Sequence, residues 1–570
     1  MSGERSVADE YVTLLAERGI EYLFGNAGTD FPPIIEALAR AAEEGRRVPV
    51  PFVVPHENVA VAMAHGHYMI SGRMQAVMVH VGLGTANGIN GLFNAARQNV
   101  PMLFTAGRTP ITEGGPLGAR NNYIHWAQEM FDQAAMVREI VKWEYELRHP
   151  AQLTTVVDRA LAVALSEPRG PVYLTLPREV LAEPAAPRAH AGETSSLAPA
   201  SVTLADPAAL AALAEALGAA RRPLIVTANL GRNAHETEAL GRLAEALAIP
   251  VVQYRPRYVC LPRSHAMHAG FDPHPWLAES DLVLVIECDV PWIPDQAKIR
   301  PGTRVAQIGA DPLFARYPIR GFRADWSIAG AAVPALRTLR ELTHADAAAV
   351  SERRGEIELR RGQMRAAWSA ARDHAAREPE ITPVHLTACL DGVKPDDAIV
   401  INEYPLALEH FGLEHPGTFF AHSPSGGLGW ALGAALGAKI AAPDRLVIAA
   451  VGDGAYMFGN PVAAHQVSRA AGLPFLTVIL NNAMWMAVQR STLAMYPKGY
   501  ASRANQPVMS SLSPSPDFEK VIESCGGYGE RVERPGDLVP ALKRAIDVVR
   551  NERRQALLNV ICRPVVERTS

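Results

Sequence analysis

Cysteine is scarce in this chain, and long hydrophobic runs are missing. The 570 residues include five cysteines, which are Cys260, Cys288, Cys389, Cys525 and Cys562, and none of them forms a C-x-x-C pair. An odd number of scattered thiols argues against a disulfide framework or a zinc site and favours a reducing compartment. No apolar run reaches the length of a membrane span, and the first residues lack a basic-then-apolar secretion signal. We therefore expect a cytoplasmic protein with no membrane partner.

The chain also lacks an excess of either charge. It has 55 Lys and Arg against 59 Asp and Glu, for a formal net charge of −4. Nothing in this balance indicates a nucleic acid partner. A hydrophobic content of 48% over 570 residues is ample for two to four domains with their own cores.

Short apolar runs alternate with helical patterns in three blocks, which we expect to be domains spanning residues 1–185, 202–345 and 380–570. This alternation predicts an α/β fold of three doubly wound parallel sheets. An Ala-, Pro- and Ser-rich linker at 182–201 follows the first block, and a charged helix at 351–373 precedes the third. The expected strands cover residues 21–28, 50–54, 74–82, 101–107, 223–229, 250–254, 281–287, 303–309, 398–404, 445–452, 475–480 and 556–562.

The first and third blocks resemble each other. Residues 62–84 and 431–454 each read as a small-residue helix, a turn, a strand and then Gly-x-Gly. The third block carries Asp453 between its glycines, whereas the first carries Leu83. We interpret this as an internal duplication in which only one copy is built for a cation.

Asp453 follows a buried strand, where a charge costs several kcal/mol unless it is paired. A helical pattern over 456–474 and a strand over 475–480 follow, and that strand ends at Asn481 and Asn482. In a parallel βαβ unit, Asp453 and Asn482 both lie at carboxyl strand ends, where α/β sheets bind ligands. Their oxygens suit Mg²⁺, and equally Ca²⁺, with a phosphate on the adjoining helix N-terminus. The alternative is that Asp453 only caps that helix.

The chain contains Gly-Asp-Gly, then 26 residues, and then Asn-Asn. This pattern resembles the signature of the thiamine-diphosphate-dependent enzymes. The stretches "LFGNAGTDFP", "PHENVAVA", "MVHVGLGTANG" and "SGGLGWAL" place the resemblance nearest to the benzoylformate decarboxylase and acetolactate synthase branches. It covers nearly the whole chain. It implies a pyrimidine-binding domain, a central domain and a diphosphate-binding domain, in that order.

The resemblance also implies roles for particular residues. The metal ligands would be Asp453, Asn482 and the main-chain carbonyl of Met484. Glu57, in "PHEN", would bond the cofactor's aminopyrimidine and so help it to form a reactive carbanion. Leu428 would wedge the two cofactor rings together, with the Gly426 carbonyl as an acceptor. The cofactor-binding residues are then Glu57, Gly426, Leu428, Gly452, Asp453, Gly454, Ala455, Asn482 and Met484.

On the substrate side, the resemblance implies Thr29 and His80 as catalytic residues. His80 would give or take a proton, an assistance of about 10²–10⁴-fold when well placed; the alternative is a buried structural histidine. His56, beside Glu57, is interpreted as structural. Weaker candidates are Asp30, Asn121 and Gln489.

Two segments depart from benzoylformate decarboxylase. Residues 287–302 contain no counterpart of its central-domain histidine and carry Trp292 and Asp295 instead. Its hydroxyl-rich diphosphate turn is replaced by 402–408, where Tyr404 or backbone groups would take over. These departures leave the substrate open.

The resemblance implies that the substrate is a small carbonyl compound and that the reaction is decarboxylation of a 2-oxo acid. It implies carboligation as a linked activity. The alternatives are an acetolactate-synthase-like carboligase, a 2-hydroxyacyl-CoA lyase, an enzyme with FAD in its central block, and a non-catalytic relative that binds the cofactor. FAD is not expected, and the intact Glu57 argues against the last alternative. In this family the cofactor lies between two subunits, which implies a homodimer or homotetramer.

Overall fold

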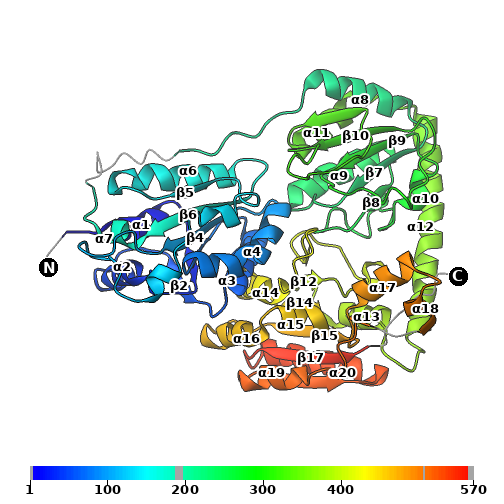
Figure 1. Ribbon diagram of the computed structural model, residues 1–570. Coiled ribbons are helices and arrows are strands. Elements are labelled where there is room, and N and C mark those ends of the chain that lie inside the picture. The colour runs from blue at the N-terminus through cyan, green and yellow to red at the C-terminus, as the bar shows by residue number, and fades with distance from the viewer. Residues whose placement is uncertain (1–3, 187–196, 505–507, 563–570) are drawn as a thin grey trace.

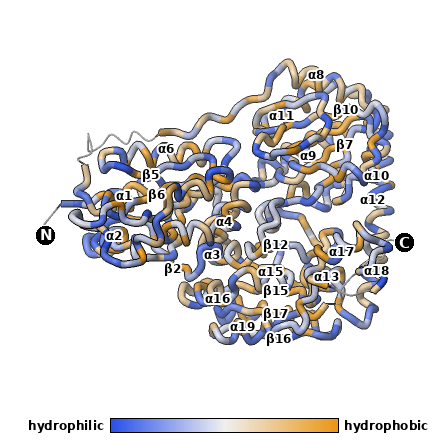
Figure 2. The backbone as a smooth tube through the Cα atoms, viewed as in Figure 1, coloured by the Kyte–Doolittle hydropathy of each residue, from blue (hydrophilic) through white to orange (hydrophobic). Residues whose placement is uncertain are grey.

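The computed structural model describes residues 4–186, 197–504 and 508–562. The chain forms three lobes, each built around its own parallel sheet (Figure 1). Hydrophobic segments lie mainly in the interior of each lobe and hydrophilic ones mainly on its outside (Figure 2). The predicted fold class, three doubly wound parallel-sheet α/β domains, is therefore confirmed.

The first domain has a six-stranded sheet in the order β2-β1-β3-β4-β6-β5, and every pair is parallel. Its elements are α1 (Val7–Glu17), β1 (Tyr22–Gly25), α2 (Pro32–Glu43), β2 (Val50–Val53), α3 (Glu57–Ser71), β3 (Ala76–Val79), α4 (Val81–Arg97), β4 (Met102–Arg108), α5 (Ile124–Ala127), β5 (Glu144–Glu146), α6 (Leu153–Leu165), β6 (Pro171–Pro177) and α7 (Arg178–Ala182).

The central domain has a five-stranded parallel sheet in the order β11-β10-β9-β7-β8. The long helix α12 (Ala347–Ala375) then runs along one side of the molecule to the third domain (Figure 1). The elements of the central domain are α8 (Pro207–Ala219), β7 (Pro223–Thr227), α9 (Ala234–Leu247), β8 (Val251–Gln253), α10 (His274–Leu277), β9 (Leu282–Ile286), β10 (Arg304–Gly309), β11 (Trp326–Ala329) and α11 (Ala332–Leu342).

The third domain has a six-stranded parallel sheet in the order β13-β12-β14-β15-β17-β16. Its elements are α13 (Pro383–Val393), β12 (Ile399–Glu403), β13 (Phe419–Ala421), α14 (Ala431–Ala441), β14 (Val447–Gly452), α15 (Asp453–Phe458), α16 (Pro461–Ala470), β15 (Leu476–Asn481), α17 (Met486–Met495), α18 (Tyr500–Ala504), α19 (Phe518–Ser524), β16 (Tyr528–Val532), α20 (Pro535–Arg550) and β17 (Ala556–Ile561).

The strand order is the same in the first and third sheets when their strands are numbered from one to six, namely 2-1-3-4-6-5. This identity supports the internal duplication inferred from sequence. The predicted helix over 456–474 is in fact two helices, because Asn460 has a left-handed φ of 50° and Pro461 has no N–H to continue the first one. Part of the predicted linker, 187–196, lies outside the described residues.

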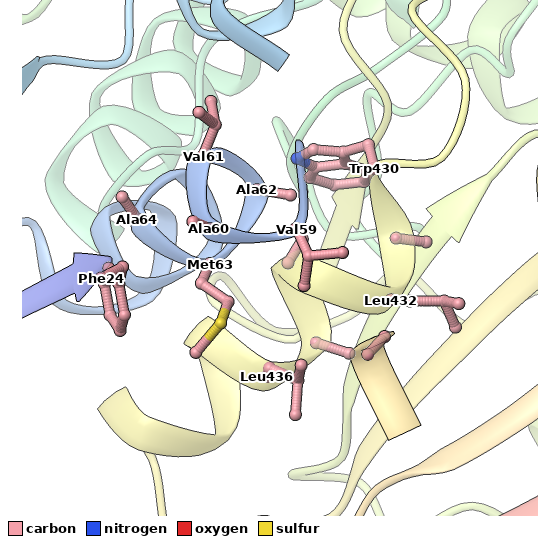
Figure 3. Packing of buried hydrophobic residues seen from close by; sticks show 14 of the residues in the cluster. Phe24, Val59, Ala60, Val61, Ala62, Met63, Ala64, Trp430, Leu432 and Leu436 are labelled. Carbon is pink, nitrogen blue, oxygen red and sulfur yellow. The ribbon is translucent and has the colours of Figure 1, made fainter. Parts of the chain in front are cut away.

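The first and third domains meet through α3 and α14, which contribute to one shared hydrophobic core. Figure 3 shows Ala62 of α3 near Trp430, the residue that precedes α14. Small residues allow this close approach. A Cβ atom on Gly66 would lie 2.1 Å from the carbonyl oxygen of Ala434, and one on Gly437 would lie 1.9 Å from that of Met63. The two backbones are therefore in direct contact.

All five cysteines are free thiols. In the part of the chain that the structure describes, no helix combines the length and the apolar character needed to cross a membrane.

Candidate functional site

The predicted cation ligands come together at the carboxyl ends of β14 and β15. These strands are direct neighbours, with Gly452 in register with Leu480. The Met484 N–H lies 3.3 Å from Asp453 Oδ2 and 3.0 Å from Asn482 Oδ1, so the two oxygens face a common point. The carbonyl of Met484 accepts a hydrogen bond from Met486 N at 2.9 Å and retains a second lone pair.

A strained turn makes this convergence possible. Ala483, between Asn482 and Met484, has a left-handed φ of 51°, which costs a non-glycine residue roughly 1–2 kcal/mol. The side chain of Trp485 then covers the Gly-Asp-Gly turn: a Cβ atom on Gly454 would lie only 2.2 Å from its ring. Gly454 is therefore needed for this packing.

Asp453 is buried, with 3% of its surface exposed, and none of the described Lys or Arg residues pairs with it. Burial raises the pKa of its carboxyl group to about 6, although backbone N–H groups such as those of Gly454 and Met484 oppose the rise. A buried carboxylate beside an amide oxygen, without a positive partner, is the donor set that Mg²⁺ or Ca²⁺ requires. The residues therefore fit a hard divalent cation, with α15 beginning at Asp453 itself.

Glu57 is the first residue of α3 and is only 6% exposed. Its Oε2 accepts a hydrogen bond from Asn87 Nδ2 at 3.1 Å. His56 precedes it and caps α3, because its Nδ1 accepts from Asn58 N at 3.1 Å, in line with the structural role expected for it. The buried carboxylate of Glu57 retains acceptor capacity for a ligand donor.

The Gly-Gly-Leu-Gly turn before α14 is held from within by Glu403, a residue that the sequence analysis does not single out. Gly426 and Gly429 have φ values of 70° and 84°, which only glycine adopts easily. The Glu403 carboxylate accepts from Gly429 N at 2.7 Å and from Ala431 N at 2.8 Å. It thereby caps α14 and sets the backbone on both sides of Leu428. Burial raises the pKa of Glu403 to about 7.

The two halves of the candidate site meet within one chain. Helix α4 of the first domain donates to the turn: Asn90 Nδ2 bonds the carbonyl of Leu428 at 2.9 Å, and Asn94 Nδ2 bonds that of Gly427 at 2.7 Å. Because Asn87, on the same helix, bonds Glu57, α4 connects Glu57 with Leu428. The inter-subunit arrangement expected from sequence stays a prediction.

The predicted substrate-side residues lie at the carboxyl ends of β1 and β3. His80 Nδ1 is 2.5 Å from Asp30 Oδ1, and Asp30 is 2% exposed. Thr29 Oγ1 lies 3.4 Å from His125 Nε2, and Gln128 Nε2 lies 3.1 Å from His80 Nε2. The structure therefore joins Thr29, Asp30 and His80 into one cluster, which His125 and Gln128 complete.

Sequence reasoning missed His125 and Gln128 because they follow no regular pattern in the connection between β4 and β5. Asn121, a weaker candidate, lies in the same connection and accepts from Arg178 Nη2 at 3.1 Å. Gln489 instead accepts from Ser510 Oγ at 2.9 Å and supports the loop beside Trp485. The signal that could have found His125 and Gln128 is their spacing of three residues, which puts both on the one turn formed by the short helix α5 and its C-cap residue.

Of the remaining candidates, Trp292 and Asp295 lie in the central domain, and Tyr404 lies beside the Gly-Gly-Leu-Gly turn. Trp292 is 3% exposed and packs in the central core against Phe322, and Asp295 is exposed. Tyr404 has a left-handed φ of 77° and is 60% exposed, with its ring centroid 4.9 Å from that of His422. Backbone strain of this kind clusters at ligand-binding and catalytic sites.

Comparison with known families gives three matches along the chain. The models described as thiamine pyrophosphate enzyme, N-terminal TPP binding domain, central domain, and C-terminal TPP binding domain match residues 5–136, 210–339 and 403–560.

Individual relatives match over most of their length. Benzoylformate decarboxylase from Pseudomonas aeruginosa is 27% identical and aligns over 84% of this chain and 86% of its own. The acetolactate synthase isozyme 3 large subunit from Escherichia coli is 24% identical, with coverage of 96% and 93%.

Solved structures share the fold. The thiamine diphosphate-dependent 4-hydroxybenzoylformate decarboxylase of Rhodococcus jostii RHA1 has a TM-score of 0.78 at 21% identity, covering 98% of this chain and 99% of that one. Benzoylformate decarboxylase from Polynucleobacter necessarius has a TM-score of 0.77 at 20% identity, covering 99% of each chain.

Proposed function

The chain belongs to the thiamine pyrophosphate enzymes, and from this premise we propose that it decarboxylates a 2-oxo acid without oxidation, using thiamine diphosphate and Mg²⁺. Carboligation of the resulting acyl unit to an aldehyde is the linked activity. The observation that carries the proposal is the convergence of Asp453 and Asn482 on one point beside Gly454, with the Glu57 and Leu428 segments joined by α4.

The third domain would hold the charged end of the cofactor. Asp453, Asn482 and the Met484 carbonyl would bind the cation, and the backbone of the Gly-Asp-Gly turn would face the diphosphate. Ca²⁺ satisfies the same oxygen donors, so the choice of metal depends on what the cell supplies. Tyr404, which directly follows β12, would contact the same end of the ligand.

The first domain would activate the cofactor and manage protons. When bound, thiamine diphosphate supplies a nucleophilic carbon on its thiazolium ring. Glu57 would hold a hydrogen bond to the aminopyrimidine, and a charge-assisted bond in a dry site is roughly twice as strong as a neutral one. Leu428 would keep the two rings close, and Gly426 would accept from the amino group. His80, oriented by Asp30, would move the proton that replaces CO₂.

Two measurements test the proposal. Calorimetry with thiamine diphosphate should show binding that requires Mg²⁺ and is lost when the metal is chelated. A panel of aliphatic and aromatic 2-oxo acids should then give CO₂ and the matching aldehyde in equal amounts. Binding without turnover of any panel member would eliminate the decarboxylase and leave the family assignment intact.

Carboligation as the main activity is the second candidate, because the relative named acetolactate synthase aligns over 96% of this chain. Incubation with two different 2-oxo acids distinguishes the two: a carboligase gives a hydroxyketone and little free aldehyde. The acyl-CoA alternative is less well supported. Arg257 bonds Asp289 at 2.8 Å, and Arg263 bonds the carbonyl of Glu409 at 2.6 Å, so both of these cations have structural partners.

We propose a homodimer or homotetramer, and complementation between variants tests whether its sites are shared. Glu57→Gln and Asp453→Ala each damage a different half of the site. If each site combines halves from two chains, refolding the two variants together restores a fraction of the activity. If each chain forms its own site, the mixture stays inactive.

A further inference from the structure

A buried arginine organises the substrate side of the site. Arg178, 5% exposed, donates to the carbonyls of Gly118 at 2.5 Å, Ala119 at 2.6 Å and Thr29 at 2.8 Å. It therefore ties the connection after β4 to the segment after β1. His125, on this connection, is 2% exposed, whereas the side chain of Thr29 is open to solvent.

The partners of His125 determine where its proton lies. The backbone N–H of Asn121 points at His125 Nδ1 from 3.3 Å, so Nδ1 accepts. A neutral ring with an accepting Nδ1 carries its proton on Nε2. That Nε2 lies 3.4 Å from Thr29 Oγ1, a distance that ligand binding commonly shortens. His125 is therefore the donor and the Thr29 oxygen the acceptor.

The partners of His80 give the opposite arrangement. Its Nδ1 lies 2.5 Å from the Asp30 carboxylate, which can only accept while it is ionised, so Nδ1 carries the proton. His80 Nε2 then carries a lone pair, which accepts a hydrogen bond from Gln128 Nε2 at 3.1 Å. Gln128 Oε1 is buried and has no hydrogen-bond partner among the described residues. The substrate side of the site therefore contains one acceptor that no described donor satisfies.

The charges around His125 keep the ring neutral. Burial, followed by the positive charges of Arg178 and Arg120 and by His80, lowers the pKa of His125, and only Asp30 opposes them. A second proton would also have to sit on Nδ1, against the N–H of Asn121. His125 is thus a fixed donor rather than a titrating base.

We propose that His125 is a positioning residue: by donating Nε2–H to Thr29 Oγ1, it leaves the Thr29 hydroxyl hydrogen free to bind the substrate's carboxylate. The inference rests on the proposed function for the identity of that substrate. It gives the site one oriented donor, the Thr29 hydroxyl, beside His80, whose Nε2 accepts from Gln128.

A double-mutant cycle on the holoenzyme tests the coupling. His125→Phe and Thr29→Val should each lower kcat/KM for the best 2-oxo acid about tenfold, the loss of one oriented hydrogen bond. The double variant should be no slower than Thr29→Val alone, because His125 acts through Thr29. His125→Gln, whose amide still donates, should stay within about threefold of wild type. Independent losses that multiply to about 100-fold, or a fully active His125→Phe, would overturn the proposal.

A second measurement needs no substrate. In protein with ¹⁵N-labelled histidine, the signals lost in His125→Gln report the ring directly, and we expect a neutral ring protonated on Nε2 from pH 6 to 8. Protonation on Nδ1, or a cationic ring at pH 7, would refute the role of His125. If wild type turns over no 2-oxo acid yet shows the Nε2–H form, the hydrogen-bond inference stands and the proposed function falls.

Discussion

The first and third domains share one strand order but place different side chains at the carboxyl ends of their strands. After the third strand of the sheet, the first domain places His80 and the third domain places Asp453. After the fourth strand, the first domain places the connection with His125, and the third places Asn482. Under the proposed function, equivalent positions would therefore carry groups that handle protons in one domain and oxygen ligands for a cation in the other.

The helices that follow the second strand of each sheet, α3 and α14, differ in the same way. In the first domain, α3 begins with the carboxylate of Glu57, which faces the site. In the third domain, α14 is capped by Glu403 from another strand, and the chain before it presents Leu428 instead. All strands of a parallel sheet end at the same edge, so the loops that follow them meet there whatever they contain. Two such sheets can therefore hold one ligand between them.

The largest expected effect comes from removing Asp453, which the third domain carries where the first domain has Leu83. Asp453→Ala should weaken binding of thiamine diphosphate with Mg²⁺ by about 10³-fold, or roughly 4 kcal/mol, because a buried charged ligand is lost. Titration calorimetry measures this. The matched control is Leu83→Ala, between the glycines of the first copy, which should leave cofactor affinity unchanged. Equal losses in both variants would show that the two copies do not divide the work as described.

The next effect separates binding from activation. Glu57→Gln should lower turnover by about 10²-fold or more, since a charge-assisted hydrogen bond is replaced by a neutral one. Cofactor affinity should change much less than in Asp453→Ala. Steady-state turnover and calorimetry on the same preparation give both numbers. A variant that loses both properties in parallel would place Glu57 with the binding groups instead.

Much of the fold was predictable because its strands are buried on both faces and read as apolar runs. Residues 445–452 and 475–480, for example, match β14 and β15 closely. The strands left out were mostly short or lay at the edge of a sheet, such as β13 (Phe419–Ala421) and β16 (Tyr528–Val532). β13 is only three residues long, although Phe419 and Phe420 are buried, and β16 buries only Val532, so neither gives a long apolar run.

The site was predictable where a local motif carries it, and not where tertiary contacts do. Asp453 and Asn482 each end a recognisable strand, so topology alone brings them together. His125 reaches Thr29 only because Arg178 binds the intervening loop, and Glu403 reaches Gly429 across 26 positions. No spacing rule anticipates contacts of this kind.

A smaller effect is expected at the contact between the two copies. Gly437→Ala would place a Cβ 1.9 Å from the Met63 carbonyl, and the helices α3 and α14 would have to separate. We expect a loss of about 2–3 kcal/mol in the free energy of unfolding, less the gain in helix propensity. The matched control is Gly362→Ala in α12, where a Cβ meets nothing within 4 Å and should stabilise by about 0.5–1 kcal/mol. Urea denaturation measures both, and equal stabilities would mean that the helices are not packed so closely.

The smallest effect concerns pH and two histidines at the same interface. His65 and His422 both contact Trp430, with ring centroids 5.5 Å and 5.9 Å from it. Burial lowers the pKa of His65 to about 3 and that of His422 to about 4. The unfolded chain binds protons at these rings from about pH 6.5 downward, while the folded protein does not. Their stabilising contribution is therefore complete above pH 6.5 and is lost progressively as the pH falls towards 4.

His65→Leu isolates one of these protons. Each buried histidine should lower the free energy of unfolding by about 1.4 kcal/mol for each pH unit below 6.5. Without His65, the slope of that free energy against pH should therefore be smaller by about 1.4 kcal/mol per pH unit between pH 6 and pH 4.5. Urea midpoints at four or five pH values give the slopes, and pH 8 provides the reference at which neither ring is charged. His65 belongs to α3 of the first domain, and His422 follows β13 of the third. A shallower dependence of stability on pH in His65→Leu would therefore locate acid sensitivity at the junction of these two domains. An unchanged slope would mean that the domains separate before either ring takes up a proton, and the shared core would then be weaker than its packing indicates.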